Sequence, residues 1–205
     1  MKLHWSPRSP FVRKVMVCAY ERGIADRFEC VRTPVAMDTP NPALLHDNPL
    51  SKLPTLVLDD GSALFDSSVI CEYLDTLHHG ARLFPASGTE RFRALQQQAF
   101  ADGLLDIYLL LRQERNKPPA QQRPQWLDAF KVKSDASLDA LEKLAPSLRQ
   151  DGIQIGDIAI ACTLAWLDFR LPDLEWRKGR PALGAWHACF AARDAMRRTE
   201  PGDGE

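Results

Sequence analysis

The fold is decided by residues 4–23, which read HWSPRSPFVRKVMVCAYERG. Ser9 is a preferred residue for capping the N-terminus of a helix, and Pro10 suits the first helical position, where no backbone N–H is needed. Apolar side chains then recur at intervals of three and four residues, and Gly23 favours a stop just past the helix end. With the short strand candidate at 2–5, this pattern predicts a strand, a tight loop and an amphipathic helix.

The residues downstream add two strands in a hairpin and a second helix. Residues 28–32 are a candidate for the second strand. The apolar runs 55–58 and 62–65 flank an Asp-Gly pair, which is a strong hairpin signal. Asp66 or Ser67 can cap the helix that follows. The order of elements is therefore βαβ followed by ββα.

The rest of the chain is predicted to be helical. Glycine, proline and small residues cluster at 80–88, which favours a linker. Helical periodicity follows over four ranges: 90–116, 126–144, 157–169 and 183–196. The segment 200–205 is expected to be disordered. We therefore expect a first domain at 1–79 and an all-helical second domain at 89–205.

The composition favours a globular protein that acts on small molecules or on other proteins. Of the 205 residues, 26 are Lys or Arg and 27 are Asp or Glu, so no net field favours nucleic acid or an anionic membrane. The longest apolar stretch is about ten residues, too short for a bilayer core of ~30 Å. The first residues lack the apolar segment of a secretory signal, which predicts a cytoplasmic location.

Several common functional motifs are absent from the sequence. It contains no phosphate-binding loop, dinucleotide fingerprint, zinc-protease motif or serine-hydrolase elbow. The 5 cysteines are widely spaced and form no C-x-x-C pair, so we expect reduced thiols in the core. No metal site is expected.

Three short motifs occur in register with the predicted elements. They are Ser-Pro-Phe-Val-Arg-Lys-Val at 9–15, Lys-Leu-Pro-Thr-Leu at 52–56 and Asp-Ser-Ser-Val-Ile-Cys-Glu-Tyr-Leu at 66–74. Together they resemble the glutathione S-transferase family, and Gly156-Asp157 resembles the start of a capped helix in the family's second domain. The resemblance implies an α/β thioredoxin-like N-terminal domain, an all-α C-terminal domain, glutathione as co-substrate and a homodimer.

The resemblance assigns Ser9 to activation of the glutathione thiol. A helix N-terminus stabilises an anion, and a hydroxyl there can donate a hydrogen bond to a thiolate. Lowering a thiol pKa from about 8.5 by two units needs ~2.7 kcal/mol, within reach of one charge-assisted hydrogen bond plus the helix terminus. Ser6 in the same loop is a rival donor, and a simple capping role is the other interpretation of Ser9.

The resemblance also implies six residues that bind the rest of glutathione: Phe11, Lys52, Leu53, Pro54, Asp66 and Ser67. Lys52 would pair with the glycyl carboxylate, and the backbone of Leu53, before a cis Pro54, would pair with the cysteinyl part. Ser67 would receive the γ-glutamyl carboxylate, with Asp66 near the ammonium. Without a ligand, the same residues are a solvated lysine, a turn proline and a helix N-cap pair.

The acceptor pocket is expected between the loop that carries Arg8 and the helix that carries Tyr108 and Arg112. The two arginines suggest an anionic or polar co-substrate. Asp102, on the same helix, matches a position where related proteins place an acid near the γ-glutamyl amine across the dimer. The alternative for Asp102 is exposed helix surface.

These expectations describe a glutathione transferase that adds the thiolate to a small electrophile. A glutathione-dependent isomerase, peroxidase or dehalogenase would use the same thiolate. The same fold also serves as a non-catalytic glutathione-binding or interaction module, because a fold does not determine its chemistry.

Overall fold

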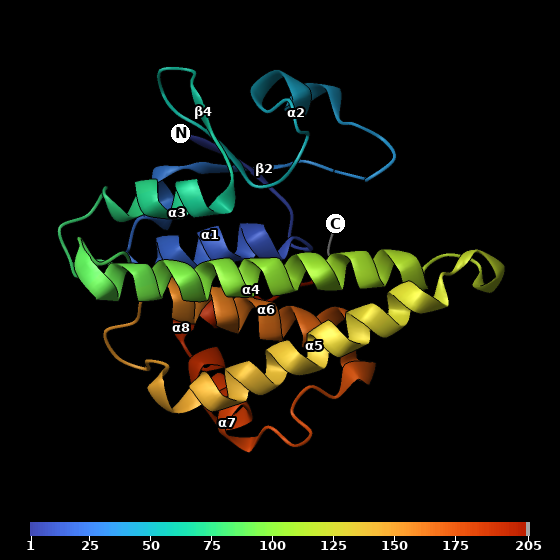
Figure 1. The fold of residues 1–205 in the computed structure, drawn as a ribbon. Helices are drawn as coiled ribbons and strands as arrows, with labels where there is room; N and C mark the ends of the chain where they lie inside the picture. Colours follow the sequence, from blue (N-terminus) through green and yellow to red (C-terminus); the bar gives the residue numbers. More distant parts are fainter. Residues whose placement is uncertain (204–205) are drawn as a thin grey trace.

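The computed structural model describes residues 1–203 and consists of one small sheet and several layers of helices (Figure 1). The strand order is β2-β1-β3-β4, with β1 parallel to β2, β1 antiparallel to β3, and β3 antiparallel to β4. The strands are β1 Lys2–Trp5, β2 Glu29–Arg32, β3 Thr55–Val57 and β4 Ala63–Leu64. This mixed four-stranded sheet, with helices packed against it, confirms the predicted thioredoxin-like N-terminal fold.

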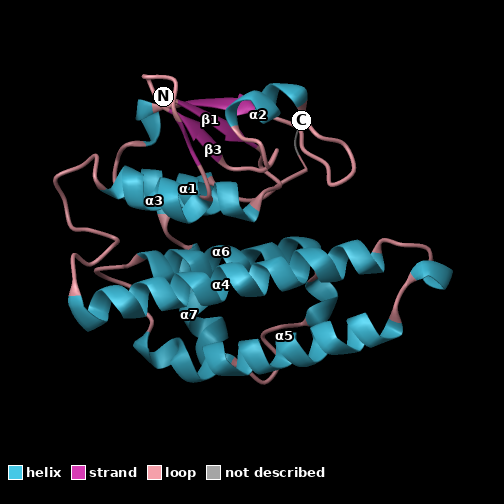
Figure 2. Cartoon of the chain, turned by 45° about the horizontal axis from the view of Figure 1, so that its top comes forward, coloured by secondary structure: helices cyan, strands magenta, loops and turns pink. Residues whose placement is uncertain are grey.

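Helix α1, Pro10–Glu21, lies at the centre of the molecule. Together with α3, Ser67–Asp75, it covers one face of the sheet, and the helical domain packs against the opposite side of both helices (Figure 2). Every residue of α1 from position 12 to position 19 is buried. Gly23 follows the helix with φ +65°, a conformation that glycine adopts without strain. The signals in residues 4–23 therefore describe the observed helix correctly.

The C-terminal domain is all helical, as expected. Its helices are α4 Gly88–Arg115, α5 Pro124–Leu144, α6 Ile155–Arg170, α7 Pro181–Ala191 and α8 Asp194–Arg198. Helices α4 and α6 pack closely at Gly156, where an added Cβ would lie 2.5 Å from the Cβ of Gln97. Asp157 accepts the N–H of Gln154 at 2.8 Å and so caps the start of α6. No helix within residues 1–203 has the length and apolar character needed to cross a membrane.

The single helix predicted over 183–196 is wrong, because the chain breaks between α7 and α8. Arg193 is extended there, and its guanidinium pairs with Glu21 at the end of α1 at 2.7 and 2.8 Å. This contact turns the following segment across α1. The segment 200–205 was expected to be disordered. Its residues 200–203 are described and follow α8, and Asp203 pairs with Arg170. Residues 204–205 lie outside the described residues.

A short helix, α2 Pro42–Asp47, lies in the loop that the sequence left without an element. Asn41 caps it by accepting the N–H groups of Ala43 and Leu44. At its other end Asp47 pairs with Nε2 of His4 on β1 at 2.7 Å. The helix therefore depends on its cap and on contact with the sheet, since six residues are too few to be stable alone.

The segment between the domains is held firmly. The buried Asp75 carboxylate, at the end of α3, accepts the N–H groups of Leu83 and Phe84 at 2.9 and 3.1 Å. Leu83 has no exposed surface, and its carbonyl accepts the N–H of Ile155 at the start of α6. These contacts attach the segment to both domains.

All five cysteines are free thiols, but only three belong to the core. Cys18, Cys71 and Cys162 are buried where α1, α3 and α6 meet, whereas Cys30 and Cys189 are exposed, contrary to expectation. Burial raises the pKa of Cys162 to about 11. Burial, together with a hydrogen bond to Cys71, holds the pKa of Cys18 well above its usual range.

His187 is a buried titratable group in the core of the helical domain. Arg177 lies 3.3 Å from Nδ1, and because a guanidinium can only donate, Nδ1 must accept. Nε2 then donates to the carbonyl of Ala161 at 3.3 Å. Burial lowers the pKa of His187 to about 4, so the ring is neutral in the folded protein at neutral pH.

This pKa predicts a loss of stability in mild acid. An unfolded histidine takes up a proton below about pH 6.5, whereas His187 in the fold does so only near pH 4, so the free energy of unfolding falls as the pH drops through this window. We expect urea unfolding of His187→Gln to show a drop between pH 7.5 and pH 4.5 that is about 2–3 kcal/mol smaller than in the parent protein. Substitution of the exposed His79 by Gln is the control, and an equal drop in all three proteins would contradict the assignment.

Candidate functional site

Ser9 lies at the junction of β1 and α1. The loop closes by a hydrogen bond from the Ser9 N–H to the Ser6 carbonyl at 3.2 Å. The Ser9 hydroxyl oxygen accepts the N–H of Val12 at 3.2 Å, as an N-cap does. Because the oxygen accepts in this bond, the hydroxyl proton remains available to donate to a ligand at the positive end of α1.

Ser6 has a weaker connection to the helix. Its hydroxyl oxygen accepts the N–H of Arg8 at 3.4 Å, within the loop itself. Ser6 and Ser9 are both half-buried. Only Ser9 combines a hydroxyl with the N-terminus of α1, which favours Ser9 as the residue that stabilises an anion.

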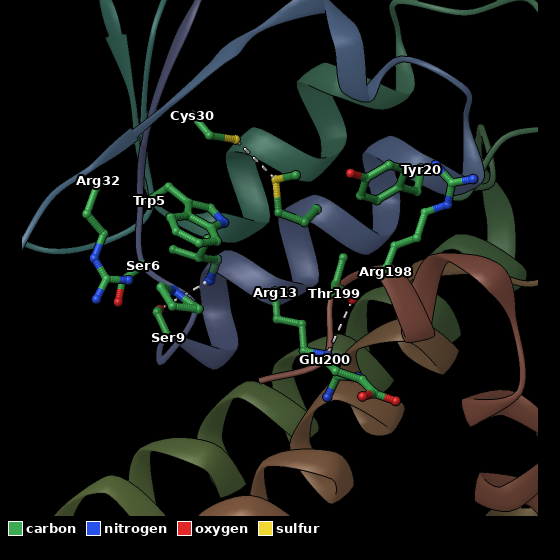
Figure 3. A pocket seen from close by; sticks show the side chains of 13 residues that line it. Trp5, Ser6, Ser9, Arg13, Tyr20, Cys30, Arg32, Arg198, Thr199 and Glu200 are labelled. Atoms are coloured by element: carbon green, nitrogen blue, oxygen red, sulfur yellow. Dashed lines mark hydrogen bonds between the residues drawn. The ribbon is translucent and has the colours of Figure 1, made fainter. Parts of the chain in front are cut away.

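A cavity of about 300 Å³ lies beside these two serines (Figure 3). Its wall includes Trp5 at the end of β1, Arg32 at the end of β2 and Glu200 after α8. The other predicted glutathione-binding residues do not line it: Phe11, Lys52, Leu53, Pro54, Asp66 and Ser67. Of the predicted glutathione-site residues, Ser9 therefore borders this cavity and these six do not.

The loop before β3 holds the predicted Lys-Leu-Pro segment in a fixed conformation. The peptide bond between Leu53 and Pro54 is cis, as the resemblance implies. The Lys52 carbonyl accepts hydrogen bonds from Thr55 Oγ1 at 2.9 Å and from Asn48 Nδ2 at 3.2 Å. Lys52 is exposed and Leu53 half-buried, so both are accessible from solvent.

Asp66 is the N-cap of α3; the sequence predicted either Asp66 or Ser67 for this role. Its carboxylate accepts the N–H of Ser68 at 2.9 Å. Asp66 is exposed, whereas Ser67 retains only 2% of its surface. The N-terminus of α3 therefore presents the carboxylate of Asp66 to solvent and keeps Ser67 largely covered.

A buried ion pair joins the two domains next to this helix start. The Nζ of Lys14, whose side chain is 1% exposed, lies 2.6 and 2.7 Å from the carboxylate oxygens of Asp102 on α4. The hydroxyl of Ser68 donates to the same carboxylate at 3.4 Å. Asp102 therefore does not lie on open helix surface, because its side chain is only 21% exposed and serves the domain interface. Phe11 is half-buried nearby, with Lys14 Nζ 5.9 Å from its ring centroid.

Asp106, one turn beyond Asp102 on α4, was not identified from the sequence. The residue is exposed as a whole, but desolvation of its carboxyl group and then the negative charge of Asp102 raise its pKa. The charges of Lys52 and Asp66 also act on it, which indicates that the middle of α4 faces the loop before β3 and the start of α3. The sequence did contain one signal for Asp106: it lies four residues after Asp102, and residues four apart are neighbours on one face of a helix.

The residues expected at the acceptor pocket are not all accessible. Tyr108 has no exposed surface, and its hydroxyl is 2.9 Å from Ser134 Oγ on α5. Tyr108 therefore faces the interior of the helical domain and cannot touch an acceptor in this structure. Arg8 is exposed and Arg112 is half-buried, and the charges of both act on Asp203. Within the described residues, no cluster of histidine, cysteine and acidic side chains could hold a metal ion.

Comparisons with known proteins match both halves of the chain. Residues 8–77 match the family model for the glutathione S-transferase N-terminal domain, and residues 124–189 match that for its C-terminal domain. The uncharacterized GST-like protein YibF of Escherichia coli (strain K12) is 35% identical over 204 residues, which are 98% of each chain. A glutathione transferase family member from Pseudomonas fluorescens Pf-5, crystallised with bound glutathione, is 41% identical, with a TM-score of 0.94 and 98% of each chain covered. A glutathione transferase family member from Pseudomonas fluorescens Pf-5 with bound S-(propanoic acid)-glutathione is 39% identical, with a TM-score of 0.89 and 98% of this chain and 100% of that one covered.

The ion pair between the domains predicts a large effect on stability. Asp102→Asn leaves the ammonium of Lys14 buried without a carboxylate, so we expect the free energy of unfolding to fall by about 3–5 kcal/mol. The double variant Lys14→Met/Asp102→Leu should recover most of that loss, because apolar side chains need no charged partner. Urea unfolding measures both.

Asp106→Asn is the matched control, since Asp106 lies on the same helix and makes no such pair. We expect its free energy of unfolding to change by less than about 0.5 kcal/mol. An effect of Asp102→Asn no larger than that of Asp106→Asn would contradict a structural role for the pair.

Proposed function

Because this chain belongs to the glutathione S-transferase family, we propose that it binds glutathione and transfers its thiolate to a small electrophile. The observation that carries the proposal is the position of Ser9, whose oxygen accepts the Val12 N–H at 3.2 Å while its proton is available at the N-terminus of α1. A thiolate placed there would receive a charge-assisted hydrogen bond and the favourable field of the helix. Ser9 is thus a donor that stabilises the nucleophile and is not itself the nucleophile.

We assign the rest of glutathione to the elements around β3 and α3. The exposed Lys52 would pair with the glycyl carboxylate, and the half-buried Leu53 backbone would pair with the cysteinyl part. Asp66 would lie near the γ-glutamyl ammonium, with the N-terminus of α3 and Ser67 toward the adjacent carboxylate. The charges of Lys52 and Asp66 both act on Asp106, which supports a common site for these residues.

We leave Tyr108 out of the acceptor site because it is buried, and retain Arg8 and Arg112 there. The related structure with S-(propanoic acid)-glutathione supports a conjugation product that carries an acid.

All five cysteines are free, which supports the cytoplasm, where thiols stay reduced, as the site of action.

Substitution of Ser9 tests the assigned role. We expect Ser9→Ala to bind glutathione but to raise the pKa of its bound thiol, lowering the conjugation rate at pH 6.5 by about 10- to 100-fold through loss of one charged hydrogen bond. Thiolate absorbance against pH and calorimetry with glutathione measure the two effects. Ser6→Ala is the matched control in the same loop, and the same loss in Ser6→Ala alone would transfer the role to Ser6.

The same experiments separate the transferase from its alternatives. No calorimetric binding of millimolar glutathione would reject the proposal altogether. Glutathione binding with no turnover on a broad panel of electrophiles, peroxides and haloacids would favour a non-catalytic binding module. Reduction of a peroxide, dehalogenation of a haloacid or isomerisation, without a conjugate as product, would keep the glutathione thiolate that Ser9 stabilises and change only the reaction.

We also propose that the protein is a homodimer, as in the related family. Val69 on α3 and Phe92 on α4 expose 47% and 72% of their surface, and α3 and α4 are linked by an ion pair between Glu72 and Arg91. We expect sedimentation at micromolar concentration to give the mass of two chains, and Phe92→Glu to shift it toward one. A monomeric parent protein would refute the dimer without affecting the assignment of Ser9.

A further inference from the structure

Two arginines from separate elements pair with one carboxylate, Asp203, beside the loop that carries Ser9, and the charge of a third arginine acts on it. Arg8 lies in that loop, Arg112 in the last turn of α4, and Arg170 at the end of α6. Arg170 donates to the two carboxylate oxygens of Asp203 at 2.6 and 3.3 Å, and Nε of Arg8 lies 3.3 Å from one of them. Hydrogen bonding by Arg170, together with the charges of Arg8 and Arg112, lowers the pKa of Asp203.

The cluster holds more positive charge than its carboxylate neutralises. Arg112 forms no ion pair with any of residues 1–203. The side chain of Arg170 is only 16% exposed, and its guanidinium lies 3.8 Å from the ring centroid of Phe169, which fixes its plane. Two guanidinium groups thus pair with the single Asp203 carboxylate, and the charge of a third, Arg112, acts on it.

The carboxylate itself is the replaceable part of this arrangement. Asp203 keeps 62% of its side chain exposed, and residues 199–203 form no helix or strand. The arginines, in contrast, come from α4, α6 and the closed loop before α1. A planar guanidinium matches a carboxylate with two parallel hydrogen bonds, so a ligand with its own carboxylate can take the place of Asp203.

We propose that Arg8, Arg112 and Arg170 bind the carboxylate of an acidic electrophile, in the place that Asp203 occupies in this structure. This inference rests on the proposed function, because it names the class of acceptor that the thiolate attacks. In the reaction, the thiolate forms a C–S bond with the electrophilic carbon, and a halide leaves with its electron pair. With an unsaturated acid, the π electrons move to the α-carbon, which takes a proton from water.

Two glutathione conjugates that differ only in their end group test the inference. S-(2-carboxyethyl)glutathione carries the acid, and S-propylglutathione ends in a methyl group. We expect calorimetry at constant ionic strength to give about tenfold tighter binding of the acid, because hydrogen bonds between charged groups are retained at a partly buried site. Arg112→Gln and Arg170→Gln should each reduce this preference to about twofold.

Arg115→Gln is the matched control. Arg115 lies on the same helix but pairs with Asp173 at 2.8 Å, outside the cluster, so the preference should stay near tenfold. Asp203→Asn removes the internal competitor and should tighten binding of the acid alone by about two- to fivefold, the value of an exposed ion pair. Unchanged binding of both conjugates to Asp203→Asn would overturn the exchange with Asp203.

The outcomes separate failure of this inference from failure of the proposed transferase function. Equal affinity for the two conjugates, in a protein that binds glutathione, would overturn the acidic acceptor and leave the transferase intact. No binding of glutathione or of either conjugate would reject both. In turnover, we expect the parent protein to have a higher kcat/KM for 4-(chloromethyl)benzoate than for its methyl ester. Arg170→Gln should remove that preference. An equal kcat/KM for the two substrates in the parent protein would also overturn the inference.

Discussion

The ion pair between Lys14 and Asp102 sets the relation of the two domains. Burying the Lys14 ammonium, whose side chain is 1% exposed, costs free energy unless a counter-ion lies beside it, so packing of the two domains depends on α4 placing Asp102 against α1. The Ser68 hydroxyl at the start of α3 contacts the same carboxylate. One carboxylate on α4 therefore links α1, which Ser9 caps, and α3, which Asp66 caps.

The parts of the fold that could be predicted are those whose signals are local. Ser9, Pro10 and Gly23 define both ends of α1 within fifteen residues, and the Asp-Gly turn defines the hairpin. The break before Arg193 could not be predicted, because its cause is Glu21, which lies 172 positions away in the sequence. The six-residue helix α2 carries the same cap-and-proline signal as α1, but it is too short to show a period.

The candidate site shows the same division. The motifs predicted the N-cap at Ser9, the cis bond before Pro54 and a cap at Asp66 or Ser67, all of which depend on neighbouring residues. Tyr108 was misplaced because periodicity finds the buried face of a helix without saying whether α5 or a pocket covers it. The ion pairs of Asp102 with Lys14 and of Arg8 with Asp203 join segments far apart in the sequence, so no single motif could predict them.

The burial of three cysteines has a consequence for the reactivity of the protein core toward electrophiles. Only a thiolate is an effective nucleophile, and the raised pKa of Cys18 and of Cys162 keeps these thiols protonated inside the core. An electrophile would therefore meet these two thiols in their unreactive form, and the packing of α1 and α6 would stay intact. Burial thus protects the sulfur atoms of Cys18 and Cys162 against alkylation, a protection that the exposed Cys30 and Cys189 lack.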